Sequence, residues 1–266
     1  MSFGTAKAAD LPRLKQLWMD CFGDAEDYVN LYFAHAFVPE NVFVLREPEI
    51  ATMLISFPVR WIAPDGDELP GAYLYAVCTD PARRGKGLCK LLMHQSEQAL
   101  KARGCAFTCL RAASAGLEAM YRRMGYSSRF TNRELVVSAS PEAEPQAVSC
   151  QRLTPTQYYN LRQLALQGAF VDYGPEVLAH QGRLGPLLSF NGGEAIAALE
   201  QYGETAIFKE YLGPAALLPA IQATLHLKTL TARTPAPADT PGAPFAMAKP
   251  LSNLEAPFGY LGLAFD

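Results

Sequence analysis

Apolar residues near the start of the chain recur three or four positions apart, which is the spacing of a buried helix face. Asp10 is a candidate N-cap, and behind it the apolar positions are Leu11, Leu14, Leu17, Trp18, Cys21 and Phe22. Asp24 is a candidate cap for a second helix, whose apolar side carries Tyr28, Val29, Tyr32, Phe33 and Phe37. We interpret these aromatic residues mainly as core.

The pattern then changes to strands and returns to a helix. Apolar runs predict strands at 42–46, 50–61 and 68–79, and Asp65-Gly66 is typical of a hairpin turn between the last two. A helix is predicted over 88–103, with Leu88, Leu91, Leu92, Ala99 and Leu100 on its buried side.

Glu97 and Lys101 are expected to form an exposed pair on this helix, and Gly104 to end it. A buried strand follows at 105–110, and a short helix at about 115–124 ends before Gly125.

The second half repeats this order of elements. Residues 138–147 have the proline- and glutamate-rich composition of a linker. Beyond them we predict helices at 155–167 and 175–182, strands at 194–201 and 204–212 joined by Tyr202-Gly203, a helix at 214–228, and strands at 244–250 and 258–265. The chain is therefore expected to form a domain at 1–138, a linker at 139–147 and a second domain at 148–266.

Composition narrows the class of protein. A net charge of −3 over 266 residues argues against nucleic acid as a partner. The N-terminus lacks a signal-peptide pattern, and no run of 18 apolar residues predicts a membrane span. The six cysteines form no CxxC pair and have no histidine cluster nearby, so we expect reduced thiols in the cytoplasm and no metal.

A basic glycine turn carries the candidate chemistry. It lies between the strand at 68–79 and the helix at 88–103, where Gly85 and Gly87 let backbone N–H groups approach a ligand closely. The helix N-terminus adds its partial positive charge. Four cations crowd the turn: Arg83, Arg84, Lys86 and Lys90. The arrangement favours a pyrophosphate. A P-loop is excluded because Gly87, rather than serine or threonine, follows Lys86.

The turn resembles the Arg/Gln-x-x-Gly-x-Gly/Ala signature of GCN5-related N-acetyltransferases (GNAT). Arg84 takes the first position and Gly87 the fourth, while Cys89 replaces the final Gly/Ala. Tyr121 begins a segment similar to the family's Tyr-x-x-x-Gly-Phe/Tyr. The resemblance implies that acetyl-CoA binds to the turn and to the splayed strand before it. The implied contact residues are Val77, Cys78, Thr79, Arg84, Gly85, Lys86, Gly87, Leu88 and Cys89.

The whole chain resembles tandem-GNAT proteins, distantly including those of the Eis type. This implies an α+β (mixed α/β) fold of two GNAT-like domains, each a mixed, mostly antiparallel sheet flanked by helices. The second domain is interpreted as degenerate, because Glu210 to Pro214 replaces the glycine turn with an acidic, proline-blocked one.

The resemblance also implies direct attack of a primary amine on the thioester, without an acyl-enzyme. Tyr121 is the implied acid, although a tyrosine near pKa 10 protonates a thiolate near 8.5 uphill by roughly 2 kcal/mol. The general base is open between Glu47, Asp65, Glu68, His35 and, as in Eis-like relatives, the terminal Asp266. A cysteine nucleophile is disfavoured because no histidine adjoins Cys78 or Cys89.

Two other functions stay open at this point. The chain could bind acyl-CoA as a non-catalytic sensor, or serve as an interaction protein without acetyl-CoA. The acceptor, a small amine or a peptide amine, is not defined by the sequence. Many GNAT proteins self-associate, so a homo-oligomer is allowed.

Overall fold

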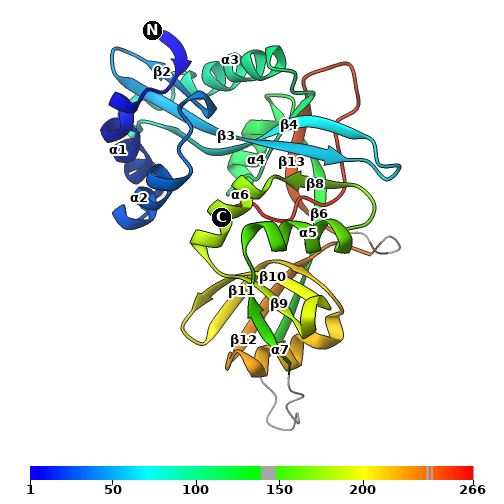
Figure 1. Ribbon diagram of the computed structural model, residues 1–266. Helices are drawn as coiled ribbons and strands as arrows, with labels where there is room; N and C mark the ends of the chain where they lie inside the picture. The colour runs from blue at the N-terminus through cyan, green and yellow to red at the C-terminus, as the bar shows by residue number, and fades with distance from the viewer. Residues whose placement is uncertain (139–147, 238–239, 241, 266) are drawn as a thin grey trace. The chain divides into compact units, whose positions relative to one another are not determined.

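The computed structural model describes residues 1–138, 148–237, 240 and 242–265, so the predicted linker at 139–147 lies outside the described residues. The chain divides into two compact units (Figure 1). Unit 1 contains Met1–Trp61, Glu68–Ser127 and Met247–Pro257, and unit 2 contains Ile62–Asp67, Ser128–Ala246 and Phe258–Asp266. Each unit therefore takes in a segment that is distant in the sequence.

The sheet of unit 1 has the order β1-β2-β3-β4-β5-β13. Its strands are β1 (Ser2–Thr5), β2 (Val42–Arg46), β3 (Ile50–Ile62), β4 (Glu68–Thr79), β5 (Phe107–Leu110) and β13 (Ala243–Pro250). The β1–β2, β2–β3 and β5–β13 pairs are antiparallel, and β4–β5 is parallel. The predictions for 42–46 and 68–79 match β2 and β4, whereas β5 begins two residues later than predicted.

Four helices flank this sheet: α1 (Leu11–Phe22), α2 (Glu26–His35), α3 (Leu88–Ala102) and α4 (Ala115–Arg122). Leu92 and Leu100 of α3 pack with Leu74 of β4 in one buried cluster. Trp18 of α1 instead contacts the ring of Tyr75, the next residue along β4. Because neighbouring side chains of a strand point to opposite faces, α1 and α3 cover opposite faces of the sheet.

Leu91, predicted on the buried side of α3, is exposed, since 36% of it is accessible. Two predictions of local side-chain contacts in unit 1 are also wrong. Asp24 does not cap α2, whose N-cap is Ala25. The carboxylate of Asp24 instead accepts a hydrogen bond from Trp18 Nε1 at 2.7 Å. Glu97 is not exposed, since only 3% of it is accessible. It accepts hydrogen bonds from Tyr126 Oη at 2.9 Å and Lys249 Nζ at 2.5 Å instead of pairing with Lys101. In both cases a partner distant in the sequence competes with the local one.

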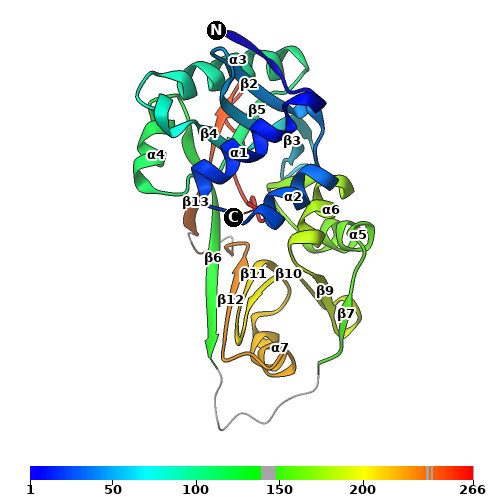
Figure 2. The same cartoon turned by 90° about the vertical axis from the view of Figure 1, so that its left-hand side faces the viewer.

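The sheet of unit 2 has the order β6-β12-β11-β10-β9-β7 (Figure 2). Its strands are β6 (Ser127–Ser138), β12 (Thr229–Thr234), β11 (Thr205–Leu212), β10 (Ala195–Tyr202), β9 (Leu187–Phe190) and β7 (Cys150–Arg152). The unit also contains β8 (Phe170–Tyr173), α5 (Pro155–Ala165), α6 (Pro175–Leu184) and α7 (Leu218–Thr224). The predicted hairpin at Tyr202-Gly203 joins β10 and β11.

Unit 2 departs from the prediction at several places. The strands β6, β7, β8, β9 and β12 were not predicted from the sequence. The helix predicted at 214–228 is only α7 with a 3₁₀ turn at Ala215–Leu217 before it. The segment 258–265 is not a strand, because it makes only isolated bridges at Gly259 and Tyr260. Glu210 lies in β11 rather than in an acidic turn, and is fully buried. Its carboxylate accepts hydrogen bonds from Tyr158 Oη and Arg162 Nε, both at 2.9 Å.

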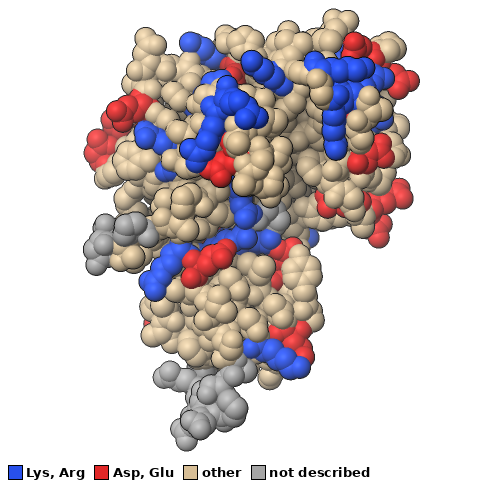
Figure 3. Space-filling model, turned by 180° about the vertical axis from the view of Figure 1, so that it is seen from behind, with Lys and Arg blue, Asp and Glu red and all other residues tan. Residues whose placement is uncertain are grey.

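Among the helices of the described residues, none combines the length and the apolar character that crossing a bilayer requires. On the face drawn in Figure 3, lysine and arginine side chains alternate with aspartate and glutamate, so this face presents no continuous basic stripe.

Candidate active site

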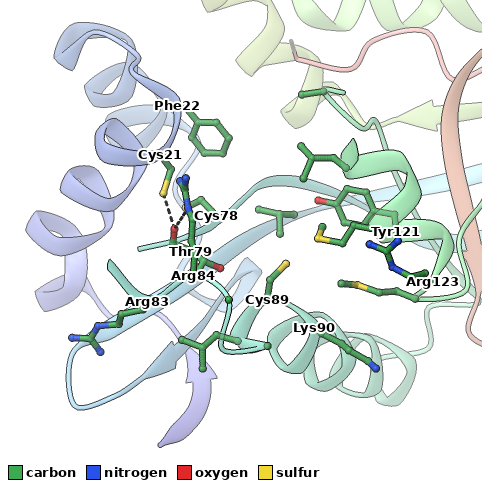
Figure 4. Close-up of a pocket in the computed structure, with 18 residues that line it drawn as sticks. Cys21, Phe22, Cys78, Thr79, Arg83, Arg84, Cys89, Lys90, Tyr121 and Arg123 are labelled. Carbon is green, nitrogen blue, oxygen red and sulfur yellow. Dashed lines mark hydrogen bonds between the residues drawn. The ribbon is translucent and has the colours of Figure 1, made fainter. Parts of the chain in front are cut away.

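A cavity of about 850 Å³ opens in unit 1 (Figure 4). Its walls come from the end of α1, the end of β4, the turn that follows β4, the start of α3, and α4. The cavity brings together all of the predicted cofactor-binding residues except Lys86: Val77, Cys78, Thr79, Arg84, Gly85, Gly87, Leu88 and Cys89. Tyr121 lies across from them on α4.

The cavity exists because β4 and β5 separate. Their parallel register runs from Gly71 opposite Phe107 to Tyr73 opposite Cys109 and goes no further. Beyond it, Ala76 has φ of 47°, in the left-handed region that non-glycine residues rarely adopt. Such strain costs on the order of 1 kcal/mol, and the surrounding core must hold it in place. The kink lets β4 leave β5 just before the turn.

Hydrogen bonds on the far side of β4 decide which backbone groups face the cavity. Cys78 O accepts from Thr52 Oγ1 at 2.6 Å, and Asp80 N donates to Ala51 O at 2.9 Å, so both residues face β3. By the alternation of a strand, the backbone groups of Val77 and Thr79 face the opposite way. The Cys78 carbonyl accepts from Thr52, and the Thr79 carbonyl accepts from Cys21 and Arg84, which leaves Val77 as the best placed of the three.

Asp80 shapes the turn, and our sequence analysis did not single it out. Its carboxylate accepts from Ala82 N at 3.0 Å and from Arg13 Nη2 at 2.6 Å. Partial burial acts to raise the pKa of Asp80, but the Ala82 and Arg13 hydrogen bonds outweigh it and lower the pKa below 3.8. The Asp80-Pro81 pair is a cap followed by an N1 proline, a signal that the sequence contained.

The turn presents backbone donors that the described chain does not use. Gly85 and Gly87 have φ of 80° and 75°, and Gly87 is the N-cap of α3. Within the described residues, no acceptor bonds to the N–H groups of 85–90, and the first helical bond runs from Leu91 N to Gly87 O. Arg84 N is different, because it makes a long 3.5 Å bond to Pro81 O. The row of available donors therefore starts at Gly85.

The four cations of the turn have different surroundings. Arg83 donates to the Glu47 carbonyl and lies 3.8 Å from the Asp80 carboxylate, and in Figure 4 it points away from Tyr121. Arg84 Nε donates to Thr79 O at 3.2 Å and so ties the turn back to β4. Lys90 lines the cavity, whereas Lys86 does not. Both lysines lack an ion pair within the described part of the chain.

Tyr121 places its hydroxyl in the cavity, where no described residue hydrogen-bonds to it (Figure 4). Burial of its ring raises the pKa well above 10.0, so the hydroxyl stays protonated. Its helix neighbours Leu117, Met120 and Met124, which could have been ordinary core, line the same cavity. Tyr121 is thus a hydrogen-bond donor rather than a ready proton source.

Among the described residues, the candidate bases Glu47, Asp65, Glu68 and His35 do not line this cavity. Glu68 pairs with Arg60 at 2.7 Å, Asp65 lies in the β3–β4 hairpin, and His35 is exposed at the end of α2. Glu47 is also exposed, and Asp266 lies outside the described residues. Cys89 lines the cavity, but burial raises its pKa to about 11, which disfavours a nucleophilic thiolate.

The cavity also contains residues that the helical spacing assigns to the core, and one with no predicted role. Cys21 and Phe22 come from the last turn of α1, and Arg123 follows α4. The helical spacing of Cys21 and Phe22 matched a buried stripe, and the spacing alone cannot separate a cavity wall from a core.

Residues 3–129 match the family model of the acetyltransferase (GNAT) domain. No curated protein matches the sequence.

Solved structures resemble nearly the whole chain. A probable N-acyltransferase from Enterococcus faecalis V583 has 13% identity and a TM-score of 0.70, over 94% of this chain and 72% of that one. A GCN5-related N-acetyltransferase from Anabaena variabilis has 17% identity and a TM-score of 0.70, over 94% and 73%. Eis1 from Mycobacterium abscessus has 12% identity and a TM-score of 0.67, over 95% and 74%. These likenesses confirm the predicted fold and extend it beyond residues 3–129.

Proposed function

We propose that the chain is an acyltransferase that transfers the acetyl group of acetyl-CoA to a primary amine, because residues 3–129 match the family model of the acetyltransferase (GNAT) domain. The observation that carries the proposal is the row of unused N–H groups at 85–90 on the edge of a cavity that also holds the Tyr121 hydroxyl.

The residues present fit acetyl-CoA as the cosubstrate. Backbone donors at a helix N-terminus bind phosphate oxygens well, because the donors converge and the helix dipole favours negative charge. Gly87 leaves open space above the turn, since a Cβ built there meets no atom within 4 Å. Lys90 and Arg123 add positive charge to the cavity. The backbone of Val77 is available to bind the amide-containing arm of the cosubstrate.

In the proposed reaction, the neutral amine attacks the thioester carbonyl carbon. A C–N bond forms, the C–S bond breaks, and CoA leaves as a thiolate while the amine proton passes to a base or to water. Tyr121 donates a hydrogen bond to the departing sulfur and stabilises the charge that develops there. The raised pKa of Tyr121 suits this role, because the hydroxyl remains a donor throughout. Asp266 as the base stays a prediction.

A non-catalytic acyl-CoA-binding protein is the second candidate. It is favoured by the lining of the cavity, which among the described residues contains no Asp, Glu or His. A transferase would need no Asp, Glu or His in the cavity if the acceptor amine arrives neutral or if water is the base. The transferase and the binding protein are therefore separated by experiment.

The test combines binding with turnover. Acetyl-CoA is titrated into the full chain by calorimetry, and release of CoA thiol is then followed with a panel of small amines and peptide amines. Binding with amine-dependent thiol release supports the transferase. Binding without release from any amine supports the sensor, and no binding of acetyl-CoA overturns both.

The proposed partners are acetyl-CoA and a small or peptide amine, and a homo-oligomer is compatible with the family. We further propose a reducing, cytoplasmic location, supported by all six cysteines being free thiols.

A further inference from the structure

Two thiols from different elements meet on the wall of the cavity. Cys21 comes from the last turn of α1 and is partly exposed, whereas Cys78 comes from β4 and is buried (Figure 4). Cys21 Sγ lies 3.2 Å from the carbonyl oxygen of Thr79, the residue next to Cys78, and the two thiols are close enough for each to shift the pKa of the other. The sequence places these residues 57 positions apart, so only the packing of α1 on β4 creates the pair.

The two thiols differ in reactivity. The pKa of Cys21 is lowered from 9.0 to about 7, chiefly because the Cys78 thiol donates a hydrogen bond to the thiolate. Arg84 also lowers it, while partial burial and Asp20 oppose the shift. Burial raises the pKa of Cys78 well above 9.0. The lowered pKa of Cys21 favours its thiolate beside the protonated thiol of Cys78, an arrangement found in thiols that react with oxidants.

We propose that Cys21 and Cys78 form an oxidation-sensitive pair, which hydrogen peroxide converts to a disulfide between α1 and β4. The Cys21 thiolate attacks one peroxide oxygen; an S–O bond forms, the O–O bond breaks, and hydroxide leaves and takes a proton. The Cys78 sulfur then attacks Cys21; an S–S bond forms, the S–O bond breaks, and water leaves. Two thiols lose two electrons and peroxide is reduced to two waters.

The pair is coupled to the turn through Thr79. Cys21 Sγ and Arg84 Nε both donate to Thr79 O, each at 3.2 Å. Oxidation removes the Cys21 hydrogen from this arrangement, so the Thr79 carbonyl loses one of its two donors. We infer that the disulfide weakens acetyl-CoA binding and that bound acetyl-CoA shields Cys21; this second inference rests on the proposed function.

The covalent test does not depend on acetyl-CoA. The full chain is treated with hydrogen peroxide, digested without reduction and analysed by mass spectrometry. A Cys21–Cys78 linked peptide that dithiothreitol separates supports the proposal. In C78S, a sulfenic acid should be trapped at Cys21 by dimedone. Absence of both products overturns the pair.

Alkylation of the native chain provides a second, independent readout. Iodoacetamide should modify Cys21 at a rate that is half-maximal near pH 7, because the thiolate is lost as pH falls through its pKa. Cys105, whose pKa burial raises above 9.0, is the matched control and should react only at higher pH. Equal pH profiles for the two thiols would contradict the proposal.

Acetyl-CoA binding is then measured before and after oxidation, with C105S as a variant that keeps the pair. Weaker binding after peroxide, restored by dithiothreitol and absent in C21S, supports the coupling to the turn. If the linked peptide forms but binding is unchanged, the coupling is overturned while the pair stands. If reduced protein does not bind acetyl-CoA at all, the proposed function has failed instead.

Discussion

Replacing Gly87 with alanine tests the cradle at the turn most directly. Gly87 has φ of 75°, and a Cβ at this position meets no atom within 4 Å. The substitution therefore introduces backbone strain but no clash within the described chain. A non-glycine residue in the left-handed region costs about 1 kcal/mol, so the free energy of unfolding should fall by about that amount.

Gly104 offers a matched control at the other end of α3. It has φ of 91° and, like Gly87, has no atom within 4 Å of a built Cβ. Gly104→Ala should therefore lower the free energy of unfolding by a similar amount, about 1 kcal/mol. Gly104 lies outside the cavity lining, so the comparison tests whether position beside the cavity matters for binding.

The two variants should separate in ligand binding. A methyl group at Gly87 occupies the space through which phosphate oxygens approach the N–H groups of 85–90. Losing one hydrogen bond to a charged group costs about 1.5–3 kcal/mol. The dissociation constant of acetyl-CoA should therefore rise about tenfold to hundredfold in Gly87→Ala. Gly104→Ala should bind acetyl-CoA as the unaltered chain does.

The assays are urea unfolding at neutral pH and calorimetric titration of acetyl-CoA at 25 °C. If Gly87→Ala and Gly104→Ala bind acetyl-CoA equally well, the N–H groups of the turn do not hold the diphosphate and the proposed site is wrong. If Gly87→Ala lowers the free energy of unfolding far more than Gly104→Ala does, the glycine at 87 is needed for folding, and the binding result no longer tests the cradle alone.

Three further substitutions test the surrounding structure. Tyr121→Phe should lower turnover about tenfold to hundredfold with nearly unchanged acetyl-CoA affinity, and unchanged turnover in the thiol-release assay would remove Tyr121 from the mechanism. Asp80→Ala should lower the free energy of unfolding by about 1 kcal/mol through loss of the Ala82 N–H cap. Because the Asp80 pKa is lowered below 3.8, this deficit should be full at neutral pH and shrink only as pH falls below 3.8; a deficit independent of pH would contradict the assignment. Gly71→Ala places a Cβ 2.3 Å from the Phe107 ring. The free energy of unfolding in urea should fall by about 1–3 kcal/mol. An unchanged urea midpoint would show that β4 and β5 can move apart at this position.

Much of unit 1 could be predicted because its signals are local. Alternating and apolar runs with a hairpin dipeptide define β2, β3 and β4, and these strands occur within one residue of the predicted bounds. The pair of glycines before α3 also acts locally, since each needs only its own φ to turn the chain. The predictions in unit 2 were weaker where a segment gains order from tertiary packing, as at 258–265.

The amino-acid sequence by itself determined the glycine turn, the helix that follows it and the tyrosine on α4, because backbone freedom and periodicity depend on neighbouring residues. Tertiary structure decided which of these groups remain available to a ligand. Thr52 occupies the Cys78 carbonyl, and β5 leaves β4 after Tyr73. Packing of α1 on β4 places Cys21 Sγ 3.2 Å from the carbonyl of Thr79, the residue next to Cys78. Each of these contacts joins residues far apart in the chain, and their distances are set only when the sheet and helices bury their shared apolar surfaces.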